Sequence, residues 1–179
     1  MQANELKGRA VVVLSNAEKV GQVEDVLFDA PFRQVLGFRV KKGGLLGKTE
    51  ALPRESVTSI GADALTVPSQ EMINDETRFA QLAGAATLSQ VTGTKVVTES
   101  GQLLGTISQL EIDDDAHSVM AYVLSASLVE RVMRHQEEVV QAGEVVRLGE
   151  GGIMIVADAV GTRLQAQPEQ SARASPATP

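Results

Sequence analysis

Alternation of apolar and polar residues over positions 21–40 predicts the element on which the rest of the chain is patterned. Gly21 opens a run with apolar residues at positions 23, 26 and 28, and Asp29 closes it. A second run of strand-forming residues covers 35–40. Two such runs separated by turn residues are typical of a β-hairpin. We therefore expect two antiparallel strands on either side of a turn at 30–34.

The same pattern returns at residues 105–124 in a constant register. The opening glycine, the apolar positions and the closing aspartate of the first stretch each have a counterpart 84 residues further on. A register that holds over this length indicates an internal duplication. The equivalent pairs are Gly21 and Gly105, Val23 and Ile107, Val26 and Leu110, Phe28 and Ile112, Asp29 and Asp113, Phe38 and Tyr122, and Val40 and Leu124.

Further short runs of strand-forming residues complete each copy, and short strands at close spacing suggest a small barrel or sandwich. We therefore expect an all-β fold with a minor helical part, in which two tandem small β-barrels are joined by a partly helical connector. The composition of the C-terminal residues is too polar to bury a core, so they should be disordered. The expected boundaries are 1–70 for the first repeat, 71–88 for the connector, 89–164 for the second repeat and 165–179 for the disordered tail.

An insertion over 125–141 distinguishes the second repeat, and we expect it to be helical. Ser127 and Glu130 have the spacing of a capping box, in which a hydroxyl and a carboxylate satisfy free backbone donors at a helix start. Apolar residues then recur on one helical face. Such a helix either covers an open end of the barrel or docks a partner protein. The candidate partner-binding residues are Leu128, Val132 and Met133 on the apolar face, with Arg131 and Arg134 as its polar rim.

The composition excludes several classes of function. With 23 Asp and Glu against 16 Lys and Arg, the net charge is −7, which disfavours nonspecific binding to phosphate backbones. The chain has no cysteine, so disulfides, thiolate nucleophiles and zinc–thiolate sites are excluded. No stretch reaches the roughly 20 apolar residues of a spanning helix, and residues 1–8 lack the apolar core of a signal peptide. We therefore expect a cytoplasmic protein without a membrane span.

A basic group lies between the two halves of the first repeat. Lys41, Lys42 and Lys48 are close in sequence, with Arg33 and Arg39 nearby. RNA-binding surfaces interleave such charges with stacking aromatic residues, but only Phe32 and Phe38 are near, and Phe38 aligns with the core-type Tyr122 of the second repeat. We interpret the basic group as a solvated rim, with contact to RNA as the alternative.

A glycine-rich stretch nearly matches a phosphate-binding loop. Residues 43–49, GGLLGKT, have most of the motif, but Lys42 stands where its first glycine is required. The loop should also lead into a helix, yet Pro53 follows within a few residues. We therefore interpret this stretch as a flexible connection between strands.

The cluster of Asp113, Asp114, Asp115 and His117 contains residue types that bind metal ions. Aspartates are equally common in the turns at hairpin tips, and side chains that alternate along a strand do not converge. We interpret the cluster as a turn, with a cation site as the alternative. No constellation suggests nucleophilic catalysis, so we expect a protein that is not an enzyme and holds neither a cofactor nor a metal.

The duplicated pattern resembles the PRC-barrel family. Its motif is an element G-x-V/I-x-x-V/L-x-x-D, then a second strand, then a hairpin with V-x-x-I/L-G. These pieces lie at 21–29 and 56–67 in the first repeat and at 105–113 and 144–156 in the second. The second repeat departs from the pattern, because the helical insertion replaces the approach to the last hairpin through Leu52 and Pro53.

Members of this family include the cytoplasmic part of the photosynthetic reaction-centre H subunit and the C-terminal part of the ribosome maturation factor RimM. The resemblance implies a protein-binding scaffold and not a catalyst. We therefore expect a non-enzymatic interaction scaffold or adaptor whose partner is another protein of unknown identity. The alternatives are a ribosome maturation or RNA-processing accessory factor and a soluble accessory that associates peripherally with a photosynthetic membrane complex. The sequence disfavours nucleic acid as a partner and leaves the oligomeric state open.

Overall fold

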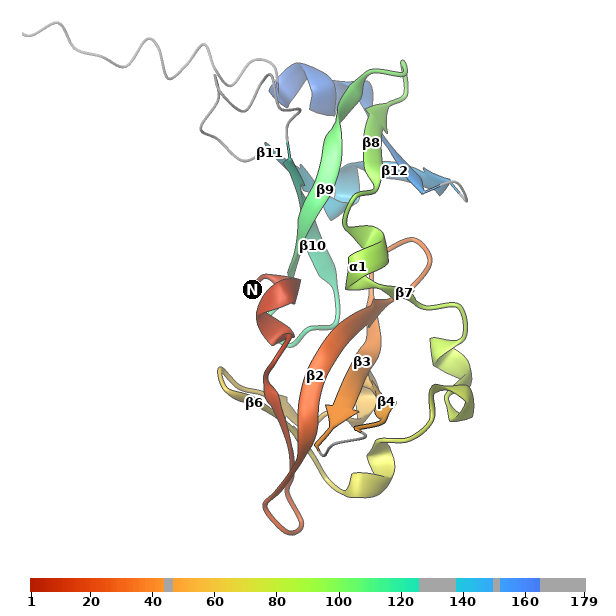
Figure 1. Ribbon diagram of the computed structural model, residues 1–179. Coiled ribbons are helices and arrows are strands. Elements are labelled where there is room, and N and C mark those ends of the chain that lie inside the picture. Colours follow the sequence, from red (N-terminus) through yellow and green to blue (C-terminus); the bar gives the residue numbers. More distant parts are fainter. Residues whose placement is uncertain (44–46, 126–137, 150–151, 165–179) are drawn as a thin grey trace, which may run out of the picture.

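The computed structural model describes residues 1–43, 47–125, 138–149 and 152–164. Strands dominate these residues and form two sheets, one from each copy of the repeat, which lie one beyond the other along the molecule (Figure 1). The expected mostly-β fold with few helices is confirmed.

The first sheet has the strand order β4-β3-β2-β1-β6-β5. Neighbouring strands are antiparallel except β1 and β6, which are parallel. Short 3₁₀ helices precede β1, separate β4 from β5, and continue the chain after β6. The elements are η1 (Ala3–Leu6), β1 (Ala10–Val13), β2 (Glu18–Phe28), β3 (Val35–Lys42), β4 (Thr49–Pro53), η2 (Arg54–Ser56), β5 (Ser59–Ile60), β6 (Ala64–Val67), η3 (Gln70–Met72), η4 (Glu76–Arg78) and η5 (Ala80–Leu82).

The second sheet repeats this topology with the order β11-β10-β9-β8-β13-β12, and β8 and β13 are again the parallel pair. The duplication read from the sequence is therefore a duplication of the fold. A further helix covers residues 158–164. The elements are β7 (Ala86–Thr87), α1 (Leu88–Val91), β8 (Lys95–Thr98), β9 (Leu103–Ile112), β10 (Val119–Ser125), β11 (Glu138–Gln141), η6 (Ala142–Glu144), β12 (Val145–Gly149) and β13 (Ile153–Val156).

Each sheet is open along the described chain. Its two end strands, β4 and β5 in the first sheet and β11 and β12 in the second, are not hydrogen-bonded to each other there. Closure of each repeat into a barrel stays a prediction.

The helical insertion predicted over 125–141 is wrong at both of its ends, which are strands. Ser125 is the last residue of β10, and residues 138–141 form β11, which pairs with β10. The physical reason is that Val140 is fully buried opposite Tyr122, so this stretch buries its β-branched residues as an edge strand. The second repeat thus keeps a strand where the first has β4. Residues 126–137 lie outside the described part of the chain.

The two repeats exchange their N-terminal segments. β7, at the start of the second repeat, pairs with residues 27–28 of β2 in the first. In return, the Ile112 N–H of β9 donates to the carbonyl oxygen of Met1 at 2.9 Å. Met1 and Ile112 occupy the positions equivalent to Ala86 and Phe28, which pair in β7 and β2. The same contact is therefore made twice, about an approximate two-fold axis between the repeats.

The hairpin turns of the two repeats meet at this axis. The Val35 N–H donates to the carbonyl oxygen of His117 at 2.9 Å, and the Val119 N–H donates to that of Arg33 at 2.8 Å. Val35 and Val119 are equivalent residues, and so are Arg33 and His117. The two hydrogen bonds are therefore related by the same approximate two-fold axis. Backbone hydrogen bonds thus fix the repeats against each other at the centre of the molecule.

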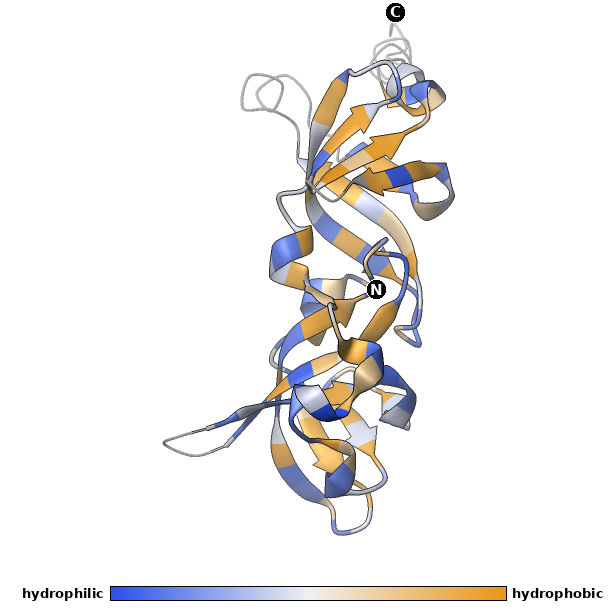
Figure 2. Cartoon of the chain, turned by 90° about the vertical axis from the view of Figure 1, so that its right-hand side faces the viewer, coloured by the Kyte–Doolittle hydropathy of each residue, from blue (hydrophilic) through white to orange (hydrophobic). Residues whose placement is uncertain are grey.

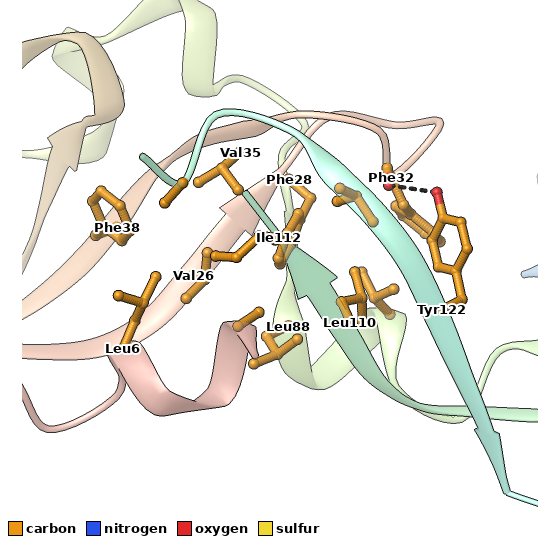
Figure 3. Packing of buried hydrophobic residues seen from close by; sticks show 14 of the residues in the cluster. Leu6, Val26, Phe28, Phe32, Val35, Phe38, Leu88, Leu110, Ile112 and Tyr122 are labelled. Atoms are coloured by element: carbon orange, nitrogen blue, oxygen red, sulfur yellow. Dashed lines mark hydrogen bonds between the residues drawn. The ribbon is translucent and has the colours of Figure 1, made fainter. Parts of the chain in front are cut away.

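One hydrophobic cluster runs through both repeats. Figure 3 shows Val26 and Phe28 of the first repeat packed beside Leu110 and Ile112 of the second, with Leu88 from α1 next to them. These residues are buried and belong to one contiguous cluster of the described residues. The two sheets therefore share one core.

Tyr122 adds a buried side-chain hydrogen bond between the repeats. It is fully buried in β10, and its hydroxyl donates to the carbonyl oxygen of Phe32 at 2.8 Å (Figure 3). Burial raises the pKa of Tyr122 to about 12, with Arg33 acting in the opposite direction. The hydroxyl is thus protonated at neutral pH, as this bond requires.

The glycines that open the repeated hairpins allow close approach of two strands. A Cβ atom on Gly21 would lie 2.6 Å from the carbonyl oxygen of Lys41, and one on Gly105 would lie 2.7 Å from that of Ser125. Lys41 and Ser125 are equivalent residues on the neighbouring strands. A glycine just before a strand indicates either a positive φ or a close backbone approach, and the close approach is the cause common to both repeats.

Replacing Tyr122 by phenylalanine should destabilise the protein. The change leaves the buried carbonyl of Phe32 without its partner, at a cost of about 1–2 kcal/mol in the free energy of unfolding. Urea denaturation of the wild type and of Tyr122→Phe measures the difference. An unchanged denaturation midpoint would show that the hydroxyl contributes nothing to the contact between repeats.

The pH dependence of stability gives this prediction a second readout. The folded-state pKa of Tyr122, about 12, lies above the value of about 10 for an exposed tyrosine. Its contribution should therefore be complete below pH of about 10 and be lost as the pH rises towards about 12. The chain has one tyrosine and no tryptophan, so near-ultraviolet absorbance reports this ionisation directly. Tyr122→Phe should lack the corresponding loss of stability.

Replacing Gly21 by alanine should cost about 1–3 kcal/mol, because the added Cβ would force β2 and β3 apart. Gly143→Ala is the matched control, since a Cβ there meets no atom within 4 Å. Chemical denaturation of both variants tests the argument. Equal midpoints for the two would show that close approach is not the reason for glycine at position 21.

Candidate functional site

The aspartates that close the repeated hairpins hold turns. The Asp113 carboxylate accepts hydrogen bonds from the N–H groups of His117 at 2.7 Å and Ser118 at 3.1 Å. Asp29 accepts from the N–H groups of Arg33 at 2.7 Å and of residue 34 at 2.9 Å. These bonds are the same in both repeats, so the aspartate belongs to the repeated architecture. The turn interpretation accounts for the contacts of Asp113.

The rest of the acidic cluster does not converge. Asp114 has a side chain that is 99% exposed, and the backbone of Asp115 is bound by Arg54, whose Nε donates to its carbonyl oxygen at 2.7 Å. The Arg54 guanidinium also lies 3.4 Å from Nδ1 of His117. Burial lowers the pKa of Arg54, while Asp115 and Asp113 act in the opposite direction. Among the described residues, no three His, Asp or Glu side chains are placed to hold a metal ion.

The basic group of the first repeat is largely neutralised. Arg39 pairs with Glu76 at 3.0 Å and Lys42 with Glu50 at 2.6 Å. Lys48 lies 3.4 Å from Asp75, where hydrogen bonds from Thr77 and Lys48 lower the pKa of that carboxyl group. Arg33 donates instead to the carbonyl oxygen of Val145, in the second repeat, at 3.0 Å. Cations that are already paired attract phosphate weakly, so this geometry favours the solvated rim over an RNA-binding surface.

Two open hollows lie beside this basic group. One, of about 440 Å³, is lined by Lys42, Glu50 and residues 69–71, 73 and 74, and the other, of about 270 Å³, by Lys19, Gly21 and Lys41 among others. Both are open to solvent, and the Lys42–Glu50 ion pair lies in the wall of the first, which is mostly polar. Ligand pockets commonly bury most of their ligand behind apolar walls, so neither hollow has the form of a small-molecule site.

Comparison with known protein families identifies the family that has this architecture. A profile of the PRC-barrel domain matches the chain twice, over residues 1–71 and 84–160. The chain belongs to the PRC-barrel family. No curated protein matches it. The two matches coincide with the two sheets, so the resemblance drawn from the repeated motif is confirmed and each repeat is one PRC-barrel domain.

The helix at residues 158–164 covers one end of the second PRC-barrel domain. Val160 and Leu164 are 2% and 3% exposed and join the shared core. The Ser100 N–H donates to Asp158 at 2.9 Å and lowers the pKa of that carboxyl group, while Arg163 donates to Glu144 at 2.9 Å. This helix is not among the elements predicted from the sequence, although two apolar residues four apart behind an aspartate are a helical signal.

The predicted partner-binding residues Leu128, Val132, Met133, Arg131 and Arg134 all lie outside the described residues. Their flanks are placed, since Ser125 ends β10 and Glu138 begins β11. The connection between these strands is 12 residues long, against six between β3 and β4 in the first domain. The helix at 158–164 lies close to the second flank, since Arg163 donates to the carbonyl oxygen of Val139 at 3.0 Å. Among the described residues, no helix is long and apolar enough to cross a membrane.

Replacing Asp113 by alanine should lower stability by about 1–2 kcal/mol, because two backbone N–H groups in the turn lose their acceptor. Asp114→Ala is the matched control, since that side chain is almost fully exposed and makes only a surface ion pair, 3.6 Å from the N-terminal amine, which contributes little. If the cluster is a turn, adding calcium or magnesium chloride should leave the melting temperature of the wild type unchanged. A saturable rise in melting temperature that Asp113→Ala abolishes would establish a cation site instead.

Proposed function

We propose that this PRC-barrel protein is a non-enzymatic scaffold that binds another protein. The observation that supports this most is the rigid union of its two domains, which share one core and exchange their N-terminal segments. A unit of this kind holds two separate surfaces at a fixed distance and orientation. That property serves assembly of other proteins, and the polar clusters of the described residues serve turns and ion pairs.

Within this proposal, the insertion between β10 and β11 supplies the partner-binding surface. It is longer than its counterpart in the first domain, and its sequence carries the apolar stripe of an amphipathic helix. Leu128, Val132 and Met133 would be the apolar anchors, and Arg131 and Arg134 the rim that attracts acidic groups. A role in RNA processing has less support, because the basic group of the first domain is paired with acidic residues.

Changing the anchors should separate binding from stability. The double variant Leu128→Ala/Val132→Ala should recover at least about tenfold less partner from the native cell, because anchor residues carry most of the binding energy. Its melting temperature should match that of the wild type. Affinity purification with quantitative mass spectrometry, alongside melting curves, gives both readouts.

Leu14→Ala serves as the control, since Leu14 is 54% exposed in the first domain and distant in sequence from the insertion. Undiminished partner recovery by a folded double variant would exclude the insertion as the binding surface. A loss of about 2–5 kcal/mol in stability would assign these residues to the core instead.

A further inference from the structure

The outer face of the second sheet carries an exposed aliphatic patch. Leu103, Val97 and Ile155 lie opposite one another on β9, β8 and β13, and Ile153 lies two residues before Ile155. Leu103 is 57% exposed and Ile153 is 42% exposed, while Val97 and Ile155 are half-buried. We call these four residues the outer patch. They point away from the core because side chains alternate along a strand and their neighbours are buried, namely Val96, Leu104, Met154 and Val156.

The first domain has the same surface without the patch. Its residues at the four equivalent positions are Lys19, Val12, Thr66 and Ala64, which pair in the same order across β2, β1 and β6. A fold of this kind is therefore stable with polar and small residues there. Figure 2 shows the side of the molecule on which β8 and β12 lie, where the strands of the second domain carry long hydrophobic stretches. Large exposed apolar patches commonly mark interaction sites.

Opposite charges lie at the two ends of the outer patch. Lys95 and Glu99 flank Val97 at two residues on either side, and both are exposed. The Glu99 N–H donates to the carbonyl oxygen of Val156 at 3.0 Å, so the strand alignment continues to this residue and its side chain shares the face of Lys95. Within the described residues, neither side chain forms an ion pair. Arg147, opposite Ile155 on the edge strand β12, ends the apolar row at the rim.

We infer that the outer patch binds the same patch of a second copy of this chain. A two-fold axis between the two faces, crossing β8 at Val97, reverses the direction of β8 in the second copy. Lys95 of each copy then lies opposite Glu99 of the other, and the aliphatic residues pack against each other between these two ion pairs. The face is thus self-complementary in charge and in polarity, as the interface of a symmetric dimer requires.

The chemistry of the face argues against other occupants. An anionic membrane surface attracts a basic cluster, but Glu99 stands within this face and the chain has a net charge of −7. An interface centred on four aliphatic residues is smaller than the roughly 800 Å² per partner of a stable complex. The dimer should therefore be weak, with a Kd on the order of 100 μM.

Residues borrowed from the first domain provide the first test. Sedimentation equilibrium of the wild type should show a monomer–dimer equilibrium, and the triple variant Leu103→Lys/Ile153→Ala/Ile155→Thr should remain monomeric. Each replacement is the residue that the first domain carries at the equivalent position, so the melting temperature should be preserved. Leu14→Ser, at an exposed site outside the patch, should dimerise like the wild type.

Charge reversal tests the arrangement itself. Lys95→Glu and Glu99→Lys should each weaken self-association by at least about tenfold, because like charges then face each other twice. The double variant Lys95→Glu/Glu99→Lys should restore it. An equimolar mixture of the two single variants should form a mixed dimer, since each cation of one then meets an anion of the other.

A wild type that stays monomeric up to several times the expected Kd overturns the inference, as does a triple variant that dimerises like the wild type. Single charge variants that associate normally overturn the proposed two-fold arrangement. The inference is independent of the proposed scaffold function, because dimerisation is read without a partner and the insertion is unchanged in every variant.

Discussion

The exchange of N-terminal segments between the two repeats is the contact on which the rest of the structure depends. A domain of about 60–70 residues buries only about 60% of its unfolded surface and is marginal alone. Here β7 completes the surface of β2, and the segment at Met1 completes that of β9, so neither repeat has a full set of contacts without the other. The continuous core follows from this exchange, since Leu88 and Leu6 are carried into it by the exchanged segments.

Elements whose signal is local could be predicted from the sequence. Alternation and turn residues located the hairpins, because burial of one sheet face imposes a period of two on the residues themselves. The register of the duplication followed from the glycine and the aspartate, each of which has a fixed mechanical task. Gly21 tolerates the carbonyl of Lys41 at a distance that a Cβ would forbid, and Asp113 binds two backbone N–H groups of its own turn.

Features that depend on distant partners could not be read in the same way. Two-residue β7 has no periodicity, and its pairing with β2 exists only because the two domains lie against each other. β11 lies at the end of a stretch with helical spacing, and only the burial of Val140 against β10 marks it as a strand. For the candidate site, the sequence identified the turn at Asp113 but not the outer patch, whose residues come together across three strands. Comparison of the two repeats at equivalent positions would have indicated it, since Lys19 and Thr66 align with Leu103 and Ile155.

The interface between the two domains shows how a duplicated fold can diverge in sequence without losing its symmetry. Phe32 and Ala116 are equivalent, both with positive φ, of 54° and 49°, and each leaves a carbonyl group at the interface. The carbonyl of Phe32 accepts from the hydroxyl of Tyr122, but the counterpart of Tyr122 is a phenylalanine, which has no donor. Arg54 supplies the donor for the carbonyl group of Ala116 instead, and its Nε lies 3.1 Å from that oxygen. An unpaired buried carbonyl is costly whatever the sequence around it, so what the two halves preserve is the satisfied acceptor and not the residue that satisfies it.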